Sequence, residues 1–259
     1  MHQKHYFTAL TAMLAQEYCC TPEDFQKSEN ILTPTVLVTK GRIYNQKRHF
    51  FHMATTGGNA VISASSKLHP FLHQWVQCQP GHALFQIPNL IPLEQELQKH
   101  GYHLTETYHM FLPTSQALDI PPRQDCSVVW LTQEELLPFY GSPSFPNAIC
   151  PECTPNRPDV LAVCAYHGTQ LMGMAGCSED MAGWLQIGID VLPEYRSKGL
   201  GTYLVTLLRN RILQDLHAIP FYGTSIANYH SWNIAIRSGF RNRPSPELHW
   251  SVLLLPDIL

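Results

Sequence analysis

The feature that most constrains the fold is the run QIGIDVLPEYRSKGLGT, which begins at Gln186. The segment 185–192 is apolar almost throughout, and an apolar run of this length predicts a buried strand. Pro193 has no N–H to donate to a neighbouring strand, so the strand should end there. A charged turn with two glycines follows, and then a helix over 202–217 with one apolar side.

A strand, a glycine-bearing turn and a helix in this order predict a phosphate site. The first N–H groups of a helix have no partner inside the helix, and the helix dipole is positive at that end. Phosphate groups bind well at such a place. Two glycines before a helix also occur in ordinary tight turns, so this pattern alone leaves both interpretations open.

Three motifs around this stretch resemble the GCN5-related N-acetyltransferase (GNAT) superfamily. Arg196–Gly201, RSKGLG, is similar to the family's acyl-CoA signature, and Val191–Arg196, VLPEYR, to the strand end that precedes it. Asn228–Ser231, followed by Gly239-Phe240, is similar to the second signature of the family. The segment 159–240 looks most like the two-part acetyltransferases of the zwittermicin A resistance type.

The resemblance implies an α/β (mixed α+β) fold, a GNAT-type central sheet flanked by helices, and transfer of an acetyl group from acetyl-CoA to a primary amine of a small molecule. Backbone N–H groups of the turn would bind the pyrophosphate, and the exposed backbone of the preceding strand would bind the pantetheine amides and polarise the thioester. The expected cofactor-binding residues are Ile189, Val191, Arg196, Ser197, Lys198, Gly199, Leu200, Gly201, Thr202, Asn228 and Ser231.

Direct attack on the thioester requires a neutral amine, so the site needs a proton acceptor. Asp190 in the strand and Glu194 in the turn are the acidic residues nearest the reacting carbonyl in sequence. The alternative for Asp190 is a structural carboxylate bonded to a neighbouring loop.

At the position of the expected proton donor to the CoA thiolate, this sequence differs from the family pattern. Many members carry a Tyr seven residues after the Asn of the second signature, and this sequence has Ala235 there. Tyr229 is therefore the expected replacement in the catalytic set, with Tyr222, Tyr195 and water as alternatives.

Two similar halves are expected, 1–124 and 125–259, separated by the proline-rich linker Pro113–Gln124. Each half reads as three strands, a helix, a strand, a helix and a strand, which predicts an internal repeat. In the first half, two of these strands are expected over 34–39 and 83–87. The first half has Ala64–Lys67, ASSK, where the second has its glycine turn. We therefore expect a degenerate GNAT-like N-terminal domain without a CoA motif and a catalytic C-terminal domain.

Composition excludes several classes of protein. The formal net charge is −3 with no basic run, which argues against a nucleic-acid partner. No segment approaches the ~20 apolar residues that cross a membrane, and the first residues do not resemble a signal peptide, so a cytoplasmic location is expected. A homodimer is compatible with the sequence and not specified by it.

Two rival functions remain open at this stage. One is a non-catalytic acyl-CoA-binding sensor or regulatory protein, which the missing Tyr at position 235 favours. The other is a zinc-dependent hydrolase built on Cys150 and Cys153, whose zinc-like spacing has no second cysteine pair beside it. We expect no metal, and the sequence does not identify the amine acceptor.

Overall fold

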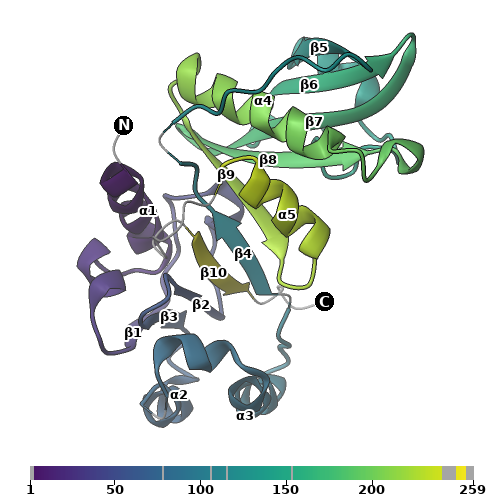
Figure 1. Cartoon of the computed structure of the whole chain (residues 1–259). Helices are drawn as coiled ribbons and strands as arrows, with labels where there is room; N and C mark the ends of the chain where they lie inside the picture. Colours follow the sequence, from purple (N-terminus) through teal and green to yellow (C-terminus); the bar gives the residue numbers. More distant parts are fainter. Residues whose placement is uncertain are drawn as a thin grey trace. The chain divides into compact units, whose positions relative to one another are not determined.

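A computed structural model describes residues 3–77, 79–105, 107–114, 116–152 and 154–240, together with the backbone of strand β10 at His249–Leu254 (Figure 1). The chain forms two compact units, Met1–Met110 with Arg243–Leu259, and Phe111–Asn242. The boundary expected from the sequence lay later, between residues 124 and 125. Strand β10, expected to close the second half, pairs instead with a strand of the first unit.

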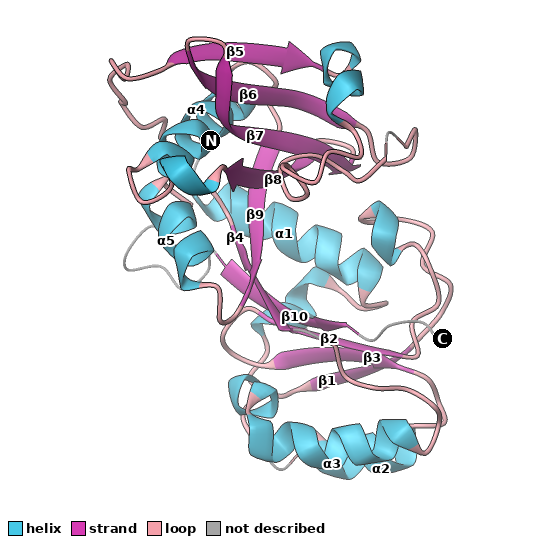
Figure 2. Ribbon diagram, turned by 90° about the vertical axis from the view of Figure 1, so that its right-hand side faces the viewer, coloured by secondary structure: helices cyan, strands magenta, loops and turns pink. Residues whose placement is uncertain are grey.

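The first unit is a sheet with helices on both faces. Its strands follow the order β1-β3-β2-β10, with β1 at Ile31–Pro34, β2 at Phe51–Thr55 and β3 at Ala60–Ala64. Helices α2 (His69–Trp75) and α3 (Ile87–Gln98) pack on one face, where their leucines join Phe51 and Ile62 in a core (Figure 2). The C-terminal end of helix α1 (Gln3–Glu17) lies on the other face. There the Thr33 hydroxyl Oγ1 of β1 donates to the carbonyl of Tyr18, the residue after α1, at 2.7 Å. Strand β4 (Thr107–Phe111) follows β10 in the strand order, and the first segment of this unit ends within it, at Met110.

Two strands predicted for the first unit are wrong. The element order predicted to be shared by the two halves is therefore wrong as well. The strand expected over 34–39 is β1, which ends at Pro34, and the strand expected over 83–87 is the 3-10 helix Gly81–Phe85. Short apolar runs do not distinguish strand from helix by period, which explains the second error. Strand β1 also pairs in parallel with β3, so this sheet is not a simple meander.

The second unit follows the expected order closely. Its sheet runs β9-β8-β7-β6-β5, antiparallel except that β9 lies parallel to β8. Helices α4 and α5 cover one face, and the short helix η4 with the loop 141–158 covers the other. The bounds are β5 Ser127–Thr132, η4 Glu134–Phe139, β6 Asp159–His167, β7 Gln170–Met181, β8 Trp184–Val191, η5 Pro193–Tyr195, α4 Leu200–Gln214, β9 Ile219–Ser225 and α5 Tyr229–Arg237.

The expected linker Pro113–Gln124 is anchored on α4. Arg209 is fully buried and its guanidinium donates to the carbonyls of Thr114 at 2.6 Å and Gln116 at 2.9 Å. The Asn210 side chain exchanges two hydrogen bonds with the backbone of Leu118. A buried cation and an amide thus bind carbonyl groups of an irregular segment, which places this segment in the second unit.

The expected mixed α/β fold class with sheets flanked by helices is confirmed. No helix in the described part of the chain has the length and apolar character needed to cross a bilayer.

Candidate active site

Strand β8 has an edge that β9 leaves uncovered. The parallel pairing of the two strands runs from Trp184↔Ile219 to Ile187↔Tyr222. Strand β8 continues to Val191, and β9 turns away from it beyond that point (Figure 2). The last four residues of β8, 188–191, therefore have no strand partner on the β9 side, and we refer to this unpaired edge as the opening.

Backbone groups of Ile189 and Val191 point into this opening. The N–H of Leu192 donates to the Met172 carbonyl at 2.9 Å, next to the Gly173↔Val191 pair. Because hydrogen-bonding direction alternates along an antiparallel ladder, the groups of the odd-numbered residues face away from β7. The carbonyl of Val191 accepts a hydrogen bond from Arg196 Nε at 2.8 Å. The binding of a ligand along this backbone stays a prediction.

The turn after β8 presents backbone N–H groups at the start of α4. Ser197 and Gly199 both have a left-handed backbone, with φ of 62° and 77°. The N–H of Tyr203 donates to the carbonyl of Gly199 and is the first N–H of α4 with such a bond. The three preceding N–H groups therefore lack a partner within the helix; they belong to Leu200, Gly201 and Thr202. Successive N–H groups in such a turn form an anion-binding concavity.

The two glycines of the turn are required for different reasons. Gly199 is needed for its positive φ, which a side chain strains. A Cβ on Gly201 would lie 3.0 Å from Ile234 Cδ1 and 3.6 Å from Val191 Cγ2. The close contacts of Gly201 are thus with α5 and β8.

A third cation at this turn escaped the sequence analysis. Arg123 Nη1 donates to the Lys198 carbonyl at 3.0 Å, and its Nε and Nη2 bind Asp125 at 2.8 and 2.5 Å. Arg196 and Lys198 are the two charges that the sequence did indicate, and Lys198 Nζ donates to the Glu194 carbonyl at 3.2 Å. Arg123 was missed because it lies in the expected linker, where no pattern connects it with the turn.

The second signature forms the start of α5. Asn228 Oδ1 accepts the N–H of Ser231 at 3.1 Å, so this side chain caps the helix. Ser231 Oγ lies 2.8 Å from the hydroxyl of Tyr222, the last β9 residue paired with β8. Burial raises the pKa of Tyr222 to about 12. Ala235 is fully buried in the same core, whereas Tyr229 is 71% exposed.

Asp190 holds the loop 141–158. Its Oδ2 accepts the N–H groups of Asn147 at 2.7 Å and Ala148 at 2.8 Å, and its Oδ1 accepts Asn147 Nδ2 at 2.7 Å. Three of the roughly four lone-pair positions of a carboxylate are thus committed to the loop. Asp190 is half-buried, whereas the apolar run predicted a fully buried strand. Glu194 lies exposed in η5.

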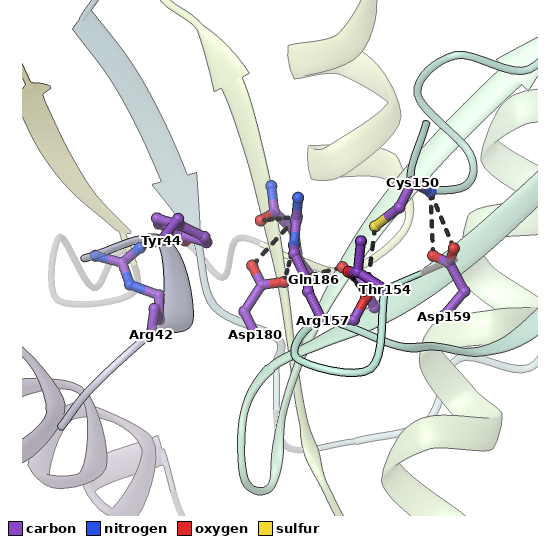
Figure 3. Close-up of polar contacts among 9 residues, drawn as sticks. Arg42, Tyr44, Cys150, Thr154, Arg157, Asp159, Asp180 and Gln186 are labelled. Atoms are coloured by element: carbon purple, nitrogen blue, oxygen red, sulfur yellow. Dashed lines mark hydrogen bonds and ion pairs between the residues drawn. The ribbon is translucent and has the colours of Figure 1, made fainter. Parts of the chain in front are cut away.

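Two further carboxylates hold the end of the same loop (Figure 3). Arg157 lies between Asp180 and Gln186, with Nε donating to Asp180 Oδ1 at 2.5 Å and Nη2 to Gln186 Oε1 at 3.1 Å. The N–H of Cys150 donates to Asp159 Oδ2 at 3.0 Å, and burial raises the pKa of the Asp159 carboxyl. The loop is therefore fixed near its middle and at its end.

No zinc arrangement is found in the described residues. They contain no group of three or more His, Cys, Asp or Glu side chains that could hold a metal. Burial raises the pKa of the Cys150 thiol to about 11, so it is protonated at neutral pH. Cys153, the other half of the expected pair, lies outside the described residues.

The second unit, which carries the site, is similar in sequence to a known protein family. Residues 125–240, a little under half of the chain, match the model described as the acetyltransferase (GNAT) family. This match covers the strands, turn and helices that form the site. No curated protein matches the sequence.

Solved structures with a similar arrangement are distant in sequence. A putative GNAT acetyltransferase from Novosphingobium aromaticivorans is 14% identical, with a TM-score of 0.46, and covers 61% of this chain and 68% of its own. A GCN5-related N-acetyltransferase from Kribbella flavida is 15% identical, with a TM-score of 0.43 and 64% coverage of each chain. A tandem GNAT protein from the clavulanic acid biosynthesis pathway is 15% identical, with a TM-score of 0.43, covering 67% and 60%. The last two are matched over less than two thirds of their own length.

Proposed function

We propose that the second unit transfers an acetyl group from acetyl-CoA to a primary amine of a small molecule. The observation that carries this proposal is the uncovered edge of β8, whose backbone at Ile189 and Val191 faces an opening beside the N-terminal turn of α4. An extended ligand can pair with such an edge as a strand would. An anionic group at the end of that ligand then reaches the start of the helix.

Each end of the site fits a different part of acetyl-CoA. The N–H groups from Ser197 to Thr202 would bind the pyrophosphate, and Arg123, Arg196 and Lys198 supply positive charge around it. Ile189 N–H would bind the oxygen of the thioester carbonyl and stabilise the charge that develops there. Asn228 and Ser231 contribute by fixing the start of α5 beside the opening.

The reaction is a direct exchange of two bonds. The amine nitrogen forms a bond to the acetyl carbon, the bond from that carbon to sulfur breaks, and the proton lost by nitrogen balances the one taken up by the thiolate. Placing the amine against the thioester supplies much of the rate. Tyr222 is our candidate donor to the thiolate, because its hydroxyl stays protonated and lies where the strands separate. Tyr229, Asp190 and Glu194 remain the candidates that sequence alone proposes.

The first unit carries no counterpart of this turn. Its loop Ala64–Lys67 leads from β3 toward α2 without a glycine pair. We therefore propose a degenerate GNAT-like unit that leaves acetyl-CoA one site per chain. Membership of the zwittermicin A resistance type is part of the same proposal.

Titration calorimetry tests the binding step. Acetyl-CoA should bind with a stoichiometry of one per chain, and Gly201→Val should weaken binding because the added side chain displaces the first turn of α4 from Ile234. Two equal sites, or unchanged binding in a folded Gly201→Val variant, would contradict the proposal.

Release of free thiol tests the chemical step. Acetyl-CoA turnover with a panel of primary amines separates an enzyme from an acyl-CoA sensor. Tight acetyl-CoA binding without thiol release for any amine favours the sensor.

A further inference from the structure

The hydrogen bond to Asp190 fixes the orientation of the Asn147 side-chain amide. A carboxylate oxygen only accepts hydrogen bonds, so the Asn147 group that lies 2.7 Å from Asp190 Oδ1 is the NH2. The side-chain carbonyl Oδ1 of Asn147 therefore points away from Asp190. Within the described part of the chain this oxygen has no hydrogen-bond partner, and Asn147 is exposed.

Asn147 lies at the start of the uncovered β8 edge. A Cβ on Gly188 would be 1.7 Å from the Asn147 carbonyl oxygen, so the loop backbone rests directly on β8 there. Gly188 follows Ile187, the last β8 residue that pairs with β9. Asp190 lies two residues further along, between Ile189 and Val191, whose backbone faces the opening.

The loop and α4 cover opposite faces of the sheet. Ile187 is buried in the core that contains Leu204 of α4, and Ile189 packs against it. Ala148 belongs to the core on the other face, with Met174. The Asn147 side chain, which binds Asp190, therefore lies at the β8 edge on the face away from α4.

We propose that Asn147 Oδ1 binds the nitrogen of the acceptor in its ammonium form, and that Asp190 is a positioning residue that holds the Asn147 amide and places a negative charge next to it. This inference rests on the proposed function and names its substrate class. An ammonium group has N–H donors for Oδ1 and a charge that Asp190 attracts. The acceptors are therefore aliphatic primary amines that are cations at neutral pH, which lose one proton to water before attack.

Binding of n-butylammonium to the CoA-loaded, 15N-labelled full chain tests this without turnover. The side-chain amide signals of Asn147, identified by their loss in Asn147→Ala, should shift with n-butylammonium and not with tetramethylammonium, which has no N–H. Asn147→Ala and Asp190→Asn should each weaken n-butylammonium binding by about tenfold or more. Asn156→Ala removes another exposed asparagine of the loop and should leave binding within about twofold. Equal affinity in Asn147→Ala and the wild type overturns the proposal.

Steady-state kinetics separate positioning from proton transfer. Asn147→Ala should raise the KM for the amine about tenfold and leave the KM for acetyl-CoA unchanged. If Asp190→Asn lowers kcat by about 10²-fold while n-butylammonium affinity is unchanged, Asp190 is the general base and the positioning role is wrong. If the wild type binds no CoA while its n-butylammonium binding still depends on Asn147, the proposed function fails and the ammonium site stands.

Discussion

Gly188 of β8 and Asn147 of the covering loop are in direct backbone contact, since a Cβ on Gly188 would lie 1.7 Å from the Asn147 carbonyl oxygen. Its partner across the ladder, Gly176, has the same relationship to the loop, with a Cβ at 2.1 Å from the Ala148 carbonyl oxygen. The loop backbone thus packs directly against two glycines that pair across β7 and β8, and a hydrogen bond to Asp190 holds the loop there.

Gly188→Ala should destabilise the protein. A methyl group cannot occupy the site without moving the loop backbone, and overpacking of this kind costs about 1–3 kcal/mol or more. We expect the thermal midpoint to fall by about 4 °C or more. Gly58→Ala is the control, because Gly58 has open space around its Cβ position and no positive φ. Equal midpoints for Gly188→Ala and the wild type would show that the loop does not rest on β8 in solution.

Arg123→Ala should weaken acetyl-CoA binding by about tenfold, because the Lys198 carbonyl loses the donor that fixes the turn. The pairing of Arg123 with Asp125 already balances much of its charge, so the effect arises mainly from a looser turn. Titration calorimetry measures it, with exposed Arg48→Ala as a matched loss of one positive charge. If both variants lose affinity equally, net charge and not the turn is responsible.

Tyr222→Phe should lower kcat by about tenfold or more and leave acetyl-CoA affinity unchanged. Its hydroxyl, with a pKa raised to about 12 by burial, remains a proton donor throughout the neutral range. Tyr229→Phe is the comparison, because Tyr229 is exposed at the start of α5. Reduced turnover in Tyr229→Phe, with full activity in Tyr222→Phe, would return the acid role to Tyr229.

Stability should fall as the pH drops below about 6.5. His52 is fully buried, stacked between Tyr18 and His49, and burial lowers the pKa of His52 well below its usual value. The unfolded chain therefore binds a proton that the folded chain excludes. The stabilisation is complete above the unfolded pKa and is lost, by up to about 1.4 kcal/mol per pH unit, as the pH falls toward the folded pKa.

Urea unfolding between pH 5 and 8 measures this dependence. His52→Phe keeps a ring in the stack and removes the titrating group, so its stability should vary less with pH than that of the wild type. His82→Phe changes an exposed histidine and should retain the wild-type slope. A His52→Phe profile that parallels the wild type would assign the pH dependence to other groups.

The sequence anticipated elements whose local signals are strong. Pro193 ends β8 within two residues of the expected position. The glycine turn and α4 follow as predicted. These signals act through the backbone of a few neighbouring residues, and a single sequence displays them fully.

The errors fall where contacts between distant segments decide the structure. The run 83–87 is apolar enough for a strand, but Gly81 packs against the backbone of Asn59 and Ala60, and the segment becomes a 3-10 helix. The linker 113–124 has no local pattern, and Arg209 and Asn210, which lie far along the chain, anchor it through side-chain hydrogen bonds.

The sequence by itself determined the strand, turn and helix of a phosphate-binding site, because Pro193, Gly199 and the apolar period of α4 act locally. Only the tertiary structure decided the role of Asp190. A carboxylate in an apolar run needs hydrogen-bond donors. Whether these donors belong to a substrate or to the protein depends on which loop folds over the carboxylate. Here Gly176 and Gly188 leave room for the backbone at Asn147, and the loop provides all three donors to Asp190.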